Sequence, residues 1–581
     1  MTAPETADPA RTPAAHYPVV IVGGGINGAG LFRDLCLQGV DCLLCEADDF
    51  CAGASAGPSR LIHGGIKYLE TGEFRLVAQS TLERNLLLKN APHYVTPIET
   101  VLPIPSWFGG ILPSAIRFFG GKAKLKDRGV LITKLGLEMF DFFGRHHRGM
   151  PRHSVTLRDA TRKTFPDIAT WVAGTATYYD ARITHAERLG LELLLDGMAA
   201  QPGSRALNHM AVSGQTDGAL AFTDRITGAV HRVTADVVVN AAGAWIDKAG
   251  AALGLATRYI GGNKGSHLVV DNPRLLAALD GKMIYFGASD GRVALLYPFM
   301  GKVLIGSTDI PVSDADEVFC SDEERDYMLG TVREVFPGIP LDAAQVIYTY
   351  CGVRPLPRAE GLDPGAVSRD HSIRTDTLPG SAVPVHALIG GKWTTFRGFA
   401  AEAADRVLKD LGRARRRSTE LEPIGGGRDF PKTEAERRAL LVRLTGIGVS
   451  EPRAKTLLGR YGTRALAVAE WCVLRQDTPL ATLPDYGRAE LGFILAHEQV
   501  GRLADLLFRR TDIALSGRLT PAVTEEAAGI AREALGWSEE RCRDEEARVA
   551  RTAATRHGLA ARFDTAVPHG AAEPARQHAS P

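Results

Sequence analysis

Residues 19–28 read Val-Val-Ile-Val-Gly-Gly-Gly-Ile-Asn-Gly and decide the fold. The apolar stretch predicts a buried strand, which runs directly into a Gly-x-Gly-x-x-Gly turn made by Gly23, Gly25 and Gly28. Gly23 permits a tight turn, Gly25 lets the backbone approach a pyrophosphate, and Gly28 lets the following helix pack close to the sheet. The N-terminus of that helix offers free N–H groups and a positive dipole end to phosphates.

A second apolar segment and an acid complete the unit. Residues 42–45 (Cys-Leu-Leu-Cys) predict a second strand, and Glu46 lies eighteen residues after Gly28. At this place a carboxylate can accept hydrogen bonds from the hydroxyls of an adenosine ribose. Strand, glycine turn, helix, strand and acid in this order predict a dinucleotide-binding unit over residues 18–50, against the alternative of a purely structural glycine turn.

Length and composition set the class of protein. The 581 residues allow two to four domains, and 45% apolar and 23% charged residues are ordinary for a globular protein. Because 68 Lys and Arg stand against 67 Asp and Glu, no basic field indicates a nucleic-acid partner. No apolar run is long enough to cross a bilayer, and residues 1–18 lack the apolar segment of a signal peptide.

The eight cysteines do not predict a metal site. Cys42 and Cys45 have a redox-like or zinc-like spacing, but they fall in a predicted buried strand with no second Cys/His pair. We expect them to be small core residues, and we expect reduced thiols in a cytoplasmic setting.

Residues 101–150 combine aromatic and basic residues. Apolar and aromatic side chains fill 102–119 and 131–143, and Lys122, Lys124, Lys126 and Arg128 lie between them. This pattern is typical of a surface that dips into the headgroups of an anionic membrane. A buried helical hairpin or a dimer contact with a basic loop would give the same pattern, so these alternatives stay open.

Strand patterns far along the chain are needed to complete the sheet of the N-terminal unit. Residues 236–245 predict a buried strand ending in a small-residue turn, and residues 385–411 predict a strand, a Gly390-Gly391 turn and a helix. Strand-rich segments lie between these elements, and residues 430–545 have a helical pattern. We therefore expect an α/β fold, in which a Rossmann-like domain is interleaved with an antiparallel-β substrate domain and followed by an all-α C-terminal domain.

Three small-residue turns suit an extended cofactor. The turns at 23–28, 240–245 and 390–392 favour FAD, whose distal ring lies far from its ribose, over NAD. The expected parts are a disordered arm (1–17), a discontinuous FAD-binding domain (18–100, 151–200, 236–262 and 352–412), the possible membrane-contact insertion (101–150), β-rich parts (201–235 and 263–351), a helical domain (425–548) and a disordered tail (549–581).

Seven motifs occur in the order typical of one family. They are residues 21–30 (IVGGGINGAG), 61–70 (LIHGGIKYLE), 73–77 (EFRLV), 264–267 (KGSH), 305–309 (IGSTD), 351–356 (CGVRPL) and 390–395 (GGKWTT). Over about residues 18–410 the chain resembles the FAD-dependent glycerol-3-phosphate dehydrogenases, of the D-amino-acid-oxidase-like superfamily. Residues 497–498 (His-Glu) and 506–511 (LLFRRT) also resemble the helical C-terminal domain of that family.

The resemblance implies a reaction and its partners. A flavoprotein with non-covalent FAD would oxidise glycerol 3-phosphate to dihydroxyacetone phosphate, and would pass the electrons to a membrane quinone from the cytoplasmic face. Some relatives use oxygen instead. The expected partners are therefore a polyol phosphate, a quinone and an anionic membrane, with a homodimer left open.

The reaction needs a base and cations. A hydride leaves the carbinol carbon for flavin N5 while a base takes the hydroxyl proton, and a dianionic phosphate needs cationic groups. We expect His267 to be the base, because an imidazole titrates near the working pH; a histidine that only hydrogen-bonds the backbone is the alternative. By motif carry-over, Arg354 is a second catalytic candidate, and the substrate-binding candidates are Lys67, Tyr68, Arg369 and Lys392.

Local sequence supports two of these cations and leaves an alternative for a third. Arg354 lies between apolar neighbours, where an unpaired guanidinium is costly, which favours a role toward a ligand. Lys392 follows two glycines at the start of a predicted helix, where cation and dipole reinforce each other. For Arg369, a surface ion pair with Asp363 or Asp370 is the alternative.

The cofactor is expected to contact residues from every segment of the FAD domain. His63 is expected to pack against the flavin. The cofactor-binding candidates are Gly23, Gly25, Asn27, Gly28, Glu46, Ser55, Ser59, His63, Gly64, Val212, Gly243, Thr308, Gly391 and Thr394.

Three departures from the family pattern leave the substrate open. Lys67 stands where Arg is common, residues 53–60 carry fewer hydroxyls, and the 101–150 segment is longer than usual. A related polyol phosphate such as a tetritol phosphate, an oxygen-using oxidase of such a phosphate or of an amino acid, and a non-catalytic flavoprotein with a helical interaction module remain alternatives.

Overall fold

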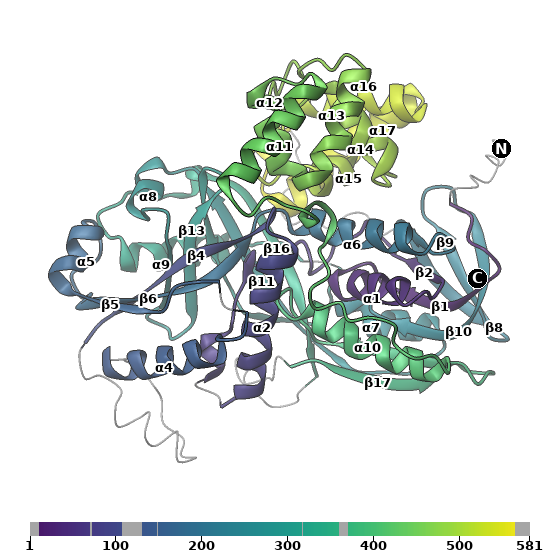
Figure 1. The fold of residues 1–581 in the computed structure, drawn as a ribbon, viewed down its shortest axis with the longest axis horizontal. Coiled ribbons are helices and arrows are strands. Elements are labelled where there is room, and N and C mark those ends of the chain that lie inside the picture. The colour runs from purple at the N-terminus through teal and green to yellow at the C-terminus, as the bar shows by residue number, and fades with distance from the viewer. Residues whose placement is uncertain are drawn as a thin grey trace.

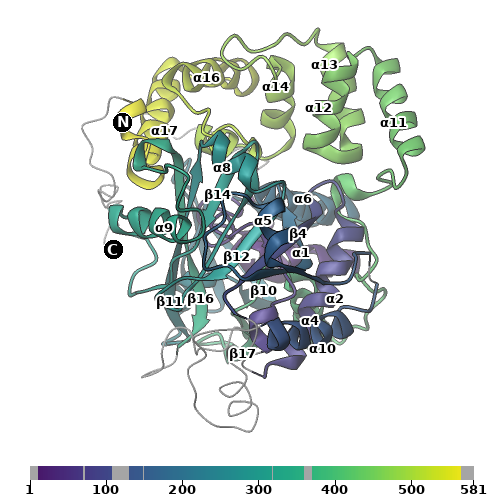
Figure 2. The ribbon, with the colours of Figure 1, turned by 90° about the vertical axis from the view of Figure 1, so that its left-hand side faces the viewer.

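Two sheets and a helical domain make up the described part of the chain (Figure 1). The computed structural model describes residues 11–69, 72–106, 130–147, 149–316, 318–358 and 370–563. A mostly parallel sheet lies on the right in Figure 1 and a mostly antiparallel sheet on the left. The C-terminal helices lie above the two sheets, at the top of Figures 1 and 2. The expected architecture, α/β with an all-α C-terminal domain, is confirmed.

The first sheet is assembled from distant segments. Its main path is β17 (Ser372–Thr377), β18 (Pro384–Ile389), β10 (Val230–Asn240), β1 (His16–Val22), β2 (Cys42–Cys45) and β7 (Arg205–Leu207), and β8 (Met210–Thr216) and β9 (Ala219–Asp224) extend it beside β10. β1 pairs in parallel with β2 and β10, and β10 pairs in parallel with β18. The carboxyl ends of these strands therefore share one edge, where ligands bind in sheets of this type.

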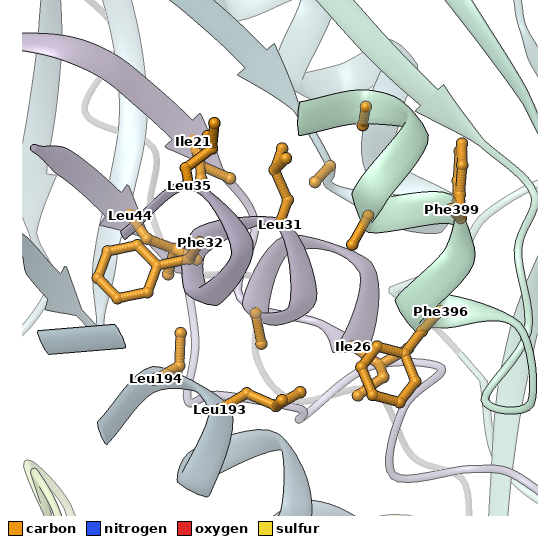
Figure 3. Close-up of a cluster of buried hydrophobic side chains, with 14 of the residues drawn as sticks. Ile21, Ile26, Leu31, Phe32, Leu35, Leu44, Leu193, Leu194, Phe396 and Phe399 are labelled. Carbon is orange, nitrogen blue, oxygen red and sulfur yellow. The ribbon is translucent and has the colours of Figure 1, made fainter. Parts of the chain in front are cut away.

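Helix α1 (Ile26–Leu37) lies at the centre of the packing on one face of this sheet. Figure 3 shows it between α6 (Ala186–Ala200) and α10 (Phe396–Asp410). Phe32 is fully buried, and a Cβ at Gly197 of α6 would come within 2.8 Å of its ring. A Cβ at Gly30 would likewise meet Phe396 at 2.8 Å. Small residues thus bring the three helices close together and fix α1 over the sheet.

Ten strands of the described residues form the second sheet. Its path is β15 (Ile310–Val312), β11 (Ile260–Val270), β14 (Lys302–Gly306), β13 (Val293–Phe299), β12 (Met283–Gly287), β4 (Val95–Ile104), β6 (Gly174–Ile183) and β3 (Leu61–Ile62), with β16 (Val346–Pro357) beside β11 and β5 (Ser154–Leu157) beside β6. β12 and β4 are parallel, whereas the other pairs are antiparallel.

Helices cover the second sheet and form the C-terminal domain. Those around the two sheets include α2 (Phe74–Asn90), α4 (Val130–Phe143), α5 (Arg158–Thr164), α7 (Ile246–Ala252), α8 (Pro273–Ala278) and α9 (Asp322–Val335). The C-terminal domain contains α11 (Glu434–Ile447), α12 (Glu451–Tyr461), α13 (Ala465–Leu474), α14 (Arg488–His497), α15 (Leu503–Asp505), α16 (Pro521–Leu535) and α17 (Glu539–His557).

Buried ion pairs join this domain to the first sheet. Asp49, just after β2, accepts hydrogen bonds from Arg510 at 2.7 and 2.8 Å and from Arg509 at 2.5 Å. Arg188 of α6 pairs with Glu498 at 2.8 Å. Burial alone would raise the pKa of Asp49, but the two arginines hold it well below its usual range. Desolvated ion pairs therefore attach the helical domain to the segments around the first sheet.

Several expected boundaries need correction. Residues 11–17 of the disordered arm expected over residues 1–17 are part of the fold, because β1 starts at His16 and Arg11 pairs with Asp224 at 2.8 Å. At the other end, α17 continues to His557, past the expected start of a tail at residue 549. Residues 1–10 and 564–581 lie outside the described part.

Two groups of strands belong to the other sheet from the one expected. β3 to β6, assigned to residues 18–100 and 151–200 of the FAD-binding domain, lie in the antiparallel sheet, together with the end of β4 in the 101–150 segment. β7 to β9, assigned to the β-rich parts, extend the parallel sheet instead. Alternation along a chain predicts a strand but not its neighbour, which long-range pairing decides.

The described part of residues 101–150 contains helix α4. Its Leu137 and Phe140 are buried, whereas Leu135 is 65% and Phe142 58% exposed. Trp107, Phe119 and the basic residues 122–128 lie outside the described part. No helix of the described residues has the length and apolarity that crossing a membrane requires.

Candidate active site

The glycine turn after β1 has the geometry that its sequence predicts. Gly23 has φ +111°, which L side chains rarely adopt, and a Cβ at Gly28 would lie 2.0 Å from the Gly23 carbonyl oxygen. The Glu46 carboxylate, at the end of β2, accepts a hydrogen bond from Gly24 N at 2.6 Å. Burial raises the pKa of Glu46. The acid is thus held beside the turn, as the dinucleotide-binding pattern requires.

The N-terminus of α1 meets the turn after β18. Ser55 Oγ accepts a hydrogen bond from Ile26 N at 2.9 Å, and Asn27 Nδ2 donates to Gly390 O at 3.0 Å. Gly391 has φ +87°, and a Cβ there would come within 2.7 Å of the Asn27 amide. The first and third small-residue turns therefore lie against each other, although more than 360 residues separate Asn27 from Gly390 along the chain.

A cavity of about 940 Å³ opens at this edge and extends to the antiparallel sheet. Most of the predicted site residues line it: Gly25, Asn27, Ser55, Ser59, His63, Tyr68, Gly243, His267, Thr308, Arg354, Gly391, Lys392 and Thr394. Gly23, Gly28, Glu46, Gly64 and Val212 lie outside the lining, and Val212 is in β8, packed on the core of the first sheet. The Lys67 side chain and Arg369 fall outside the described residues.

His267 projects from β11 into this cavity wall. Its ring stacks on Tyr350, with centroids 4.9 Å apart, and its Nε2 lies 2.8 Å from Ser59 Oγ. Its Nδ1 is buried and has no hydrogen-bond partner among the described residues. Burial, with help from Arg354 and Arg60, lowers the pKa of His267 to about 3. The expectation that this imidazole titrates near neutral pH is therefore wrong for the free protein, where it is neutral.

Arg354 reaches the cavity from β16, opposite β11. Its guanidinium donates to Asp309 at 3.2 Å, to Ser307 Oγ and Thr308 O at 3.3 Å, and to Asn263 Oδ1 at 3.4 Å. These contacts are all at the long end of hydrogen-bond distances. The guanidinium is thus paired, but loosely enough for a better acceptor to replace a partner.

Alternation along β11 separates Lys264 from His267. Lys264 Nζ donates to Glu324 at 2.6 Å, and Ser266 Oγ donates to the same carboxylate at 2.8 Å. Both side chains lie on the α9 face, whereas Asn263 lies on the face of Arg354. The resemblance motif KGSH therefore contributes only its histidine to the cavity lining.

Tyr68 and Lys392 meet at the cavity from distant segments. Lys392 Nζ lies 3.9 Å from the centre of the Tyr68 ring, a cation–π contact. Nearby, Thr394 Oγ1 accepts a hydrogen bond from His63 N at 3.1 Å. Because α10 begins only at Phe396, Lys392 lies in the turn before the helix and not at its start.

Sequence reasoning missed several lining residues. Asp309 is the last residue of the motif at 305–309, but its contact with Arg354 could not be predicted from the sequence because it forms only in the folded chain. Asp180 and Tyr178 of β6 and Arg292, next to β13, also line the cavity. Burial raises the pKa values of Asp180 and Tyr178.

One buried cluster has ligands that a metal could use, but arginines fill it. Asp49, His209 and Asp505 place ligand atoms within 4.8 Å of one another. The Asp49 carboxylate already accepts from Arg509 and Arg510. Its chemistry is that of an ion-pair network.

Comparison with known proteins gives two family matches. Residues 18–369 match the model described as FAD dependent oxidoreductase. Residues 417–542 match the model described as C-terminal domain of alpha-glycerophosphate oxidase.

Relatives cover nearly the whole chain. A glycerol-3-phosphate dehydrogenase of Synechocystis sp. is 31% identical over 90% of this chain and 94% of its own. A D-erythritol 1-phosphate dehydrogenase of Brucella abortus is 29% identical over 88% of this chain and 95% of its own. The fold is similar to the structure of a glycerol-3-phosphate dehydrogenase from Bacillus halodurans complexed with FAD, with TM-score 0.69 and 23% identity over 92% of this chain and 94% of that one.

Proposed function

The chain belongs to the family of FAD-dependent glycerol-3-phosphate dehydrogenases, and on this premise we propose that it oxidises sn-glycerol 3-phosphate to dihydroxyacetone phosphate. One observation carries the proposal. His267 and Arg354 of the antiparallel sheet line the same cavity as the turns at Gly25 and Gly391 of the parallel sheet. A proton acceptor and a cation therefore lie at the place to which a dinucleotide would extend.

The described residues fit FAD as the cofactor. The first turn of α1 has no acidic residue, so its positive dipole end suits a pyrophosphate, and within it the Ile26 N–H donates to Ser55 Oγ. The Asn27 Oδ1 atom is buried and has no hydrogen-bond partner in the described part of the chain. When bound, FAD supplies the acceptor for the hydride of an alcohol oxidation.

His267 is proposed to take the hydroxyl proton at Nε2, the atom beside Ser59 Oγ. A neutral imidazole can accept a proton, but its depressed pKa makes it a weak base in the free protein. A dianionic phosphate in the cavity would favour the imidazolium and raise this pKa. Binding of the phosphate end would thus strengthen the base that attacks the neighbouring alcohol.

Arg354 and Lys392 are proposed to hold the anionic substrate. A phosphate dianion carries more negative charge than Asp309, the carboxylate that Arg354 contacts at 3.2 Å, and it can accept two parallel N–H bonds from the guanidinium. Lys392, above the Tyr68 ring, supplies a point charge. Lys67 and Arg369 stay predictions for the same role.

Anaerobic titration of the purified yellow protein tests the reaction. We expect sn-glycerol 3-phosphate to bleach the flavin absorbance, and glycerol with inorganic phosphate to leave it unchanged. Flavin that no polyol phosphate bleaches would contradict the proposal and favour the non-catalytic alternative.

A tetritol phosphate is the second candidate substrate. The relative from Brucella abortus, named as a D-erythritol 1-phosphate dehydrogenase, supports keeping it. Titration with both phosphates separates the two, since the better substrate reduces the flavin with the higher apparent second-order rate.

Membrane quinone is the proposed electron acceptor, reached from the inner face of the cytoplasmic membrane. The exposed Leu135 and Phe142 of α4, beside Arg145, give that face the apolar and cationic groups that an anionic bilayer attracts. Turnover in air with and without a soluble quinone analogue tests the acceptor. Stoichiometric peroxide in the presence of the analogue would instead indicate an oxidase.

A further inference from the structure

A buried carboxylate holds the cavity-wall segment that contains His63, Gly64 and Gly65. Asp180 of β6 is 2% exposed, and its Oδ1 accepts a hydrogen bond from Gly64 N at 2.9 Å. The next amide upstream, His63 N, donates to Thr394 Oγ1 at 3.1 Å. Successive N–H groups of the wall are therefore fixed to β6 of the antiparallel sheet and to the turn between β18 and α10.

Gly64 itself offers no side chain by which the wall could be held. A Cβ at this position would meet Phe140 Cζ at 2.5 Å and Thr81 Cγ2 at 2.6 Å. The glycine is thus enclosed by α2 and α4, and Gly65 beside it has φ +75°. Because a glycine pair is conformationally free, the position of this segment depends on its backbone hydrogen bonds.

Arg84 of α2 keeps the carboxylate in place. Its Nη1 donates to Asp180 Oδ1 at 2.8 Å and to Tyr179 O at 3.0 Å, and the side chains of Arg84 and Asp180 are almost fully buried. Asn85 Oδ1 accepts from the other side of the guanidinium. Burial raises the pKa of Asp180, while Arg84 and the Gly64 N–H oppose this shift.

We propose that Asp180 is a positioning residue that, with Arg84, fixes the Gly64 N–H and thereby the orientation of His63 and Tyr68 in the cavity wall. It acts through the backbone of residues 63–68 and not on the reacting atoms. The functional part of this inference rests on the proposed polyol-phosphate oxidation, because His63 and Tyr68 are predicted to face flavin and substrate.

Helix α2 provides a matched control next to Arg84. Glu83 is also 2% exposed and forms a buried bidentate pair with Arg397 of α10, at 2.8 Å for the Nε bond. Both ion pairs connect α2 to a neighbouring element. Only in the Arg84–Asp180 pair does the carboxylate also accept a hydrogen bond from a backbone amide of residues 63–65. Losing either pair should lower stability, whereas only loss of Asp180 should release the wall.

The test compares Asp180→Ala, Asp180→Asn and Glu83→Ala in the holoprotein. Hydrogen exchange of peptides covering residues 61–69 should be at least tenfold faster in Asp180→Ala and unchanged in Glu83→Ala. Anaerobic flavin reduction by sn-glycerol 3-phosphate should be 10- to 100-fold slower in Asp180→Ala, since a small misplacement of binding groups has effects of this order. Asp180→Asn should stay within threefold of the wild type, because its amide oxygen can accept the same bond.

The outcomes separate this inference from the proposed function. If sn-glycerol 3-phosphate fails to bleach the wild-type flavin, the proposed function fails. Two measurements still test the role of Asp180 in that case: hydrogen exchange of residues 61–69 and the visible circular dichroism of the bound flavin. If Asp180→Ala does not fold, Asp180→Ala/Arg84→Met removes the acceptor without leaving a buried cation. The inference is overturned if that variant or Asp180→Ala shows the wild-type rates of hydrogen exchange over residues 61–69 and of flavin bleaching. It is also overturned if Glu83→Ala changes both rates as much as Asp180→Ala does.

Discussion

The guanidinium of Arg354 occupies the space that a side chain on residue 265 would fill. A Cβ at Gly265 would lie 2.1 Å from Nη2 and 2.5 Å from Cζ of Arg354. The two residues lie on paired strands, and the absence of a side chain on β11 allows the arginine of β16 to fold across it. The glycine therefore determines where the cation of the cavity lies.

Gly265→Ala should displace Arg354 and weaken substrate recognition. We expect kcat/KM to fall about 10- to 100-fold with FAD content preserved, because the cation moves and the cofactor turn does not. Steady-state kinetics and flavin absorbance measure the two quantities. Gly261→Ala on the same strand is the control, since its Cβ would have no neighbour closer than 3.5 Å.

His267→Gln should slow the chemical step. Loss of a general base costs about 10²- to 10⁴-fold in rate, whereas Gln keeps a polar group within reach of Ser59. Stopped-flow bleaching of the flavin measures this step apart from reoxidation. Bleaching at the wild-type rate would remove His267 from the reaction.

The same variant should make stability less dependent on pH. The pKa of His267 is lowered from 6.5 to about 3 in the folded protein, so the unfolded chain binds a proton that the folded one does not. Stability from this group is therefore lost as pH falls below 6.5, by about 2 kcal/mol between pH 7 and pH 5. Urea unfolding at the two pH values should show this difference shrink by about 2 kcal/mol in His267→Gln.

Arg510→Met should loosen the helical domain. It removes one of the cations that hold the buried Asp49, and breaking a buried pair costs about 3–5 kcal/mol. Arg488→Met removes a largely exposed partner of Glu533 and should cost under about 1 kcal/mol. Denaturant unfolding compares the two, and equal losses would show that the Asp49 contact is not a fastening point.

Leu135→Ser/Phe142→Ser should reduce membrane binding. Among the described side chains of α4 these two are the exposed large apolar ones, whereas Leu137 and Phe140 are buried against the protein. Co-sedimentation with anionic vesicles should fall several-fold in the double variant at unchanged flavin reduction. Val473→Ser/Leu474→Ser, exposed apolar residues of the helical domain, should bind vesicles as the wild type does.

Local patterns were sufficient for the dinucleotide unit. Gly23 and Gly28 make the tight turn and the close helix contact that the sequence implies, because these contacts form within one βαβ unit, and Glu46 lies beside that turn. Its hydrogen bonds to a ribose stay a prediction. Local patterns could not predict which sheet a strand joins. The sequence of β6 is typical of a strand, but only its long-range pairing with β4 places it in the antiparallel sheet.

The site could be predicted in part. His267 and Arg354 were found through resemblance, and strand alternation alone would have placed Lys264 on the face opposite His267. Asp309 and Asp180 could not be found, because their roles depend on contacts with Arg354, Arg84 and Gly64 that form only when separate segments meet.

The strands of the parallel sheet lie far apart in the sequence, so the ribosome completes this sheet late in synthesis. β1 ends at Val22, but β18 ends only at Ile389. At roughly 5–20 residues per second of synthesis, the later strand emerges tens of seconds after the first. During that interval the nascent chain exposes an apolar strand edge that invites association with other chains. Recovery of intact protein from cells should therefore depend on growth temperature and chaperone supply more than on the stability of the finished molecule.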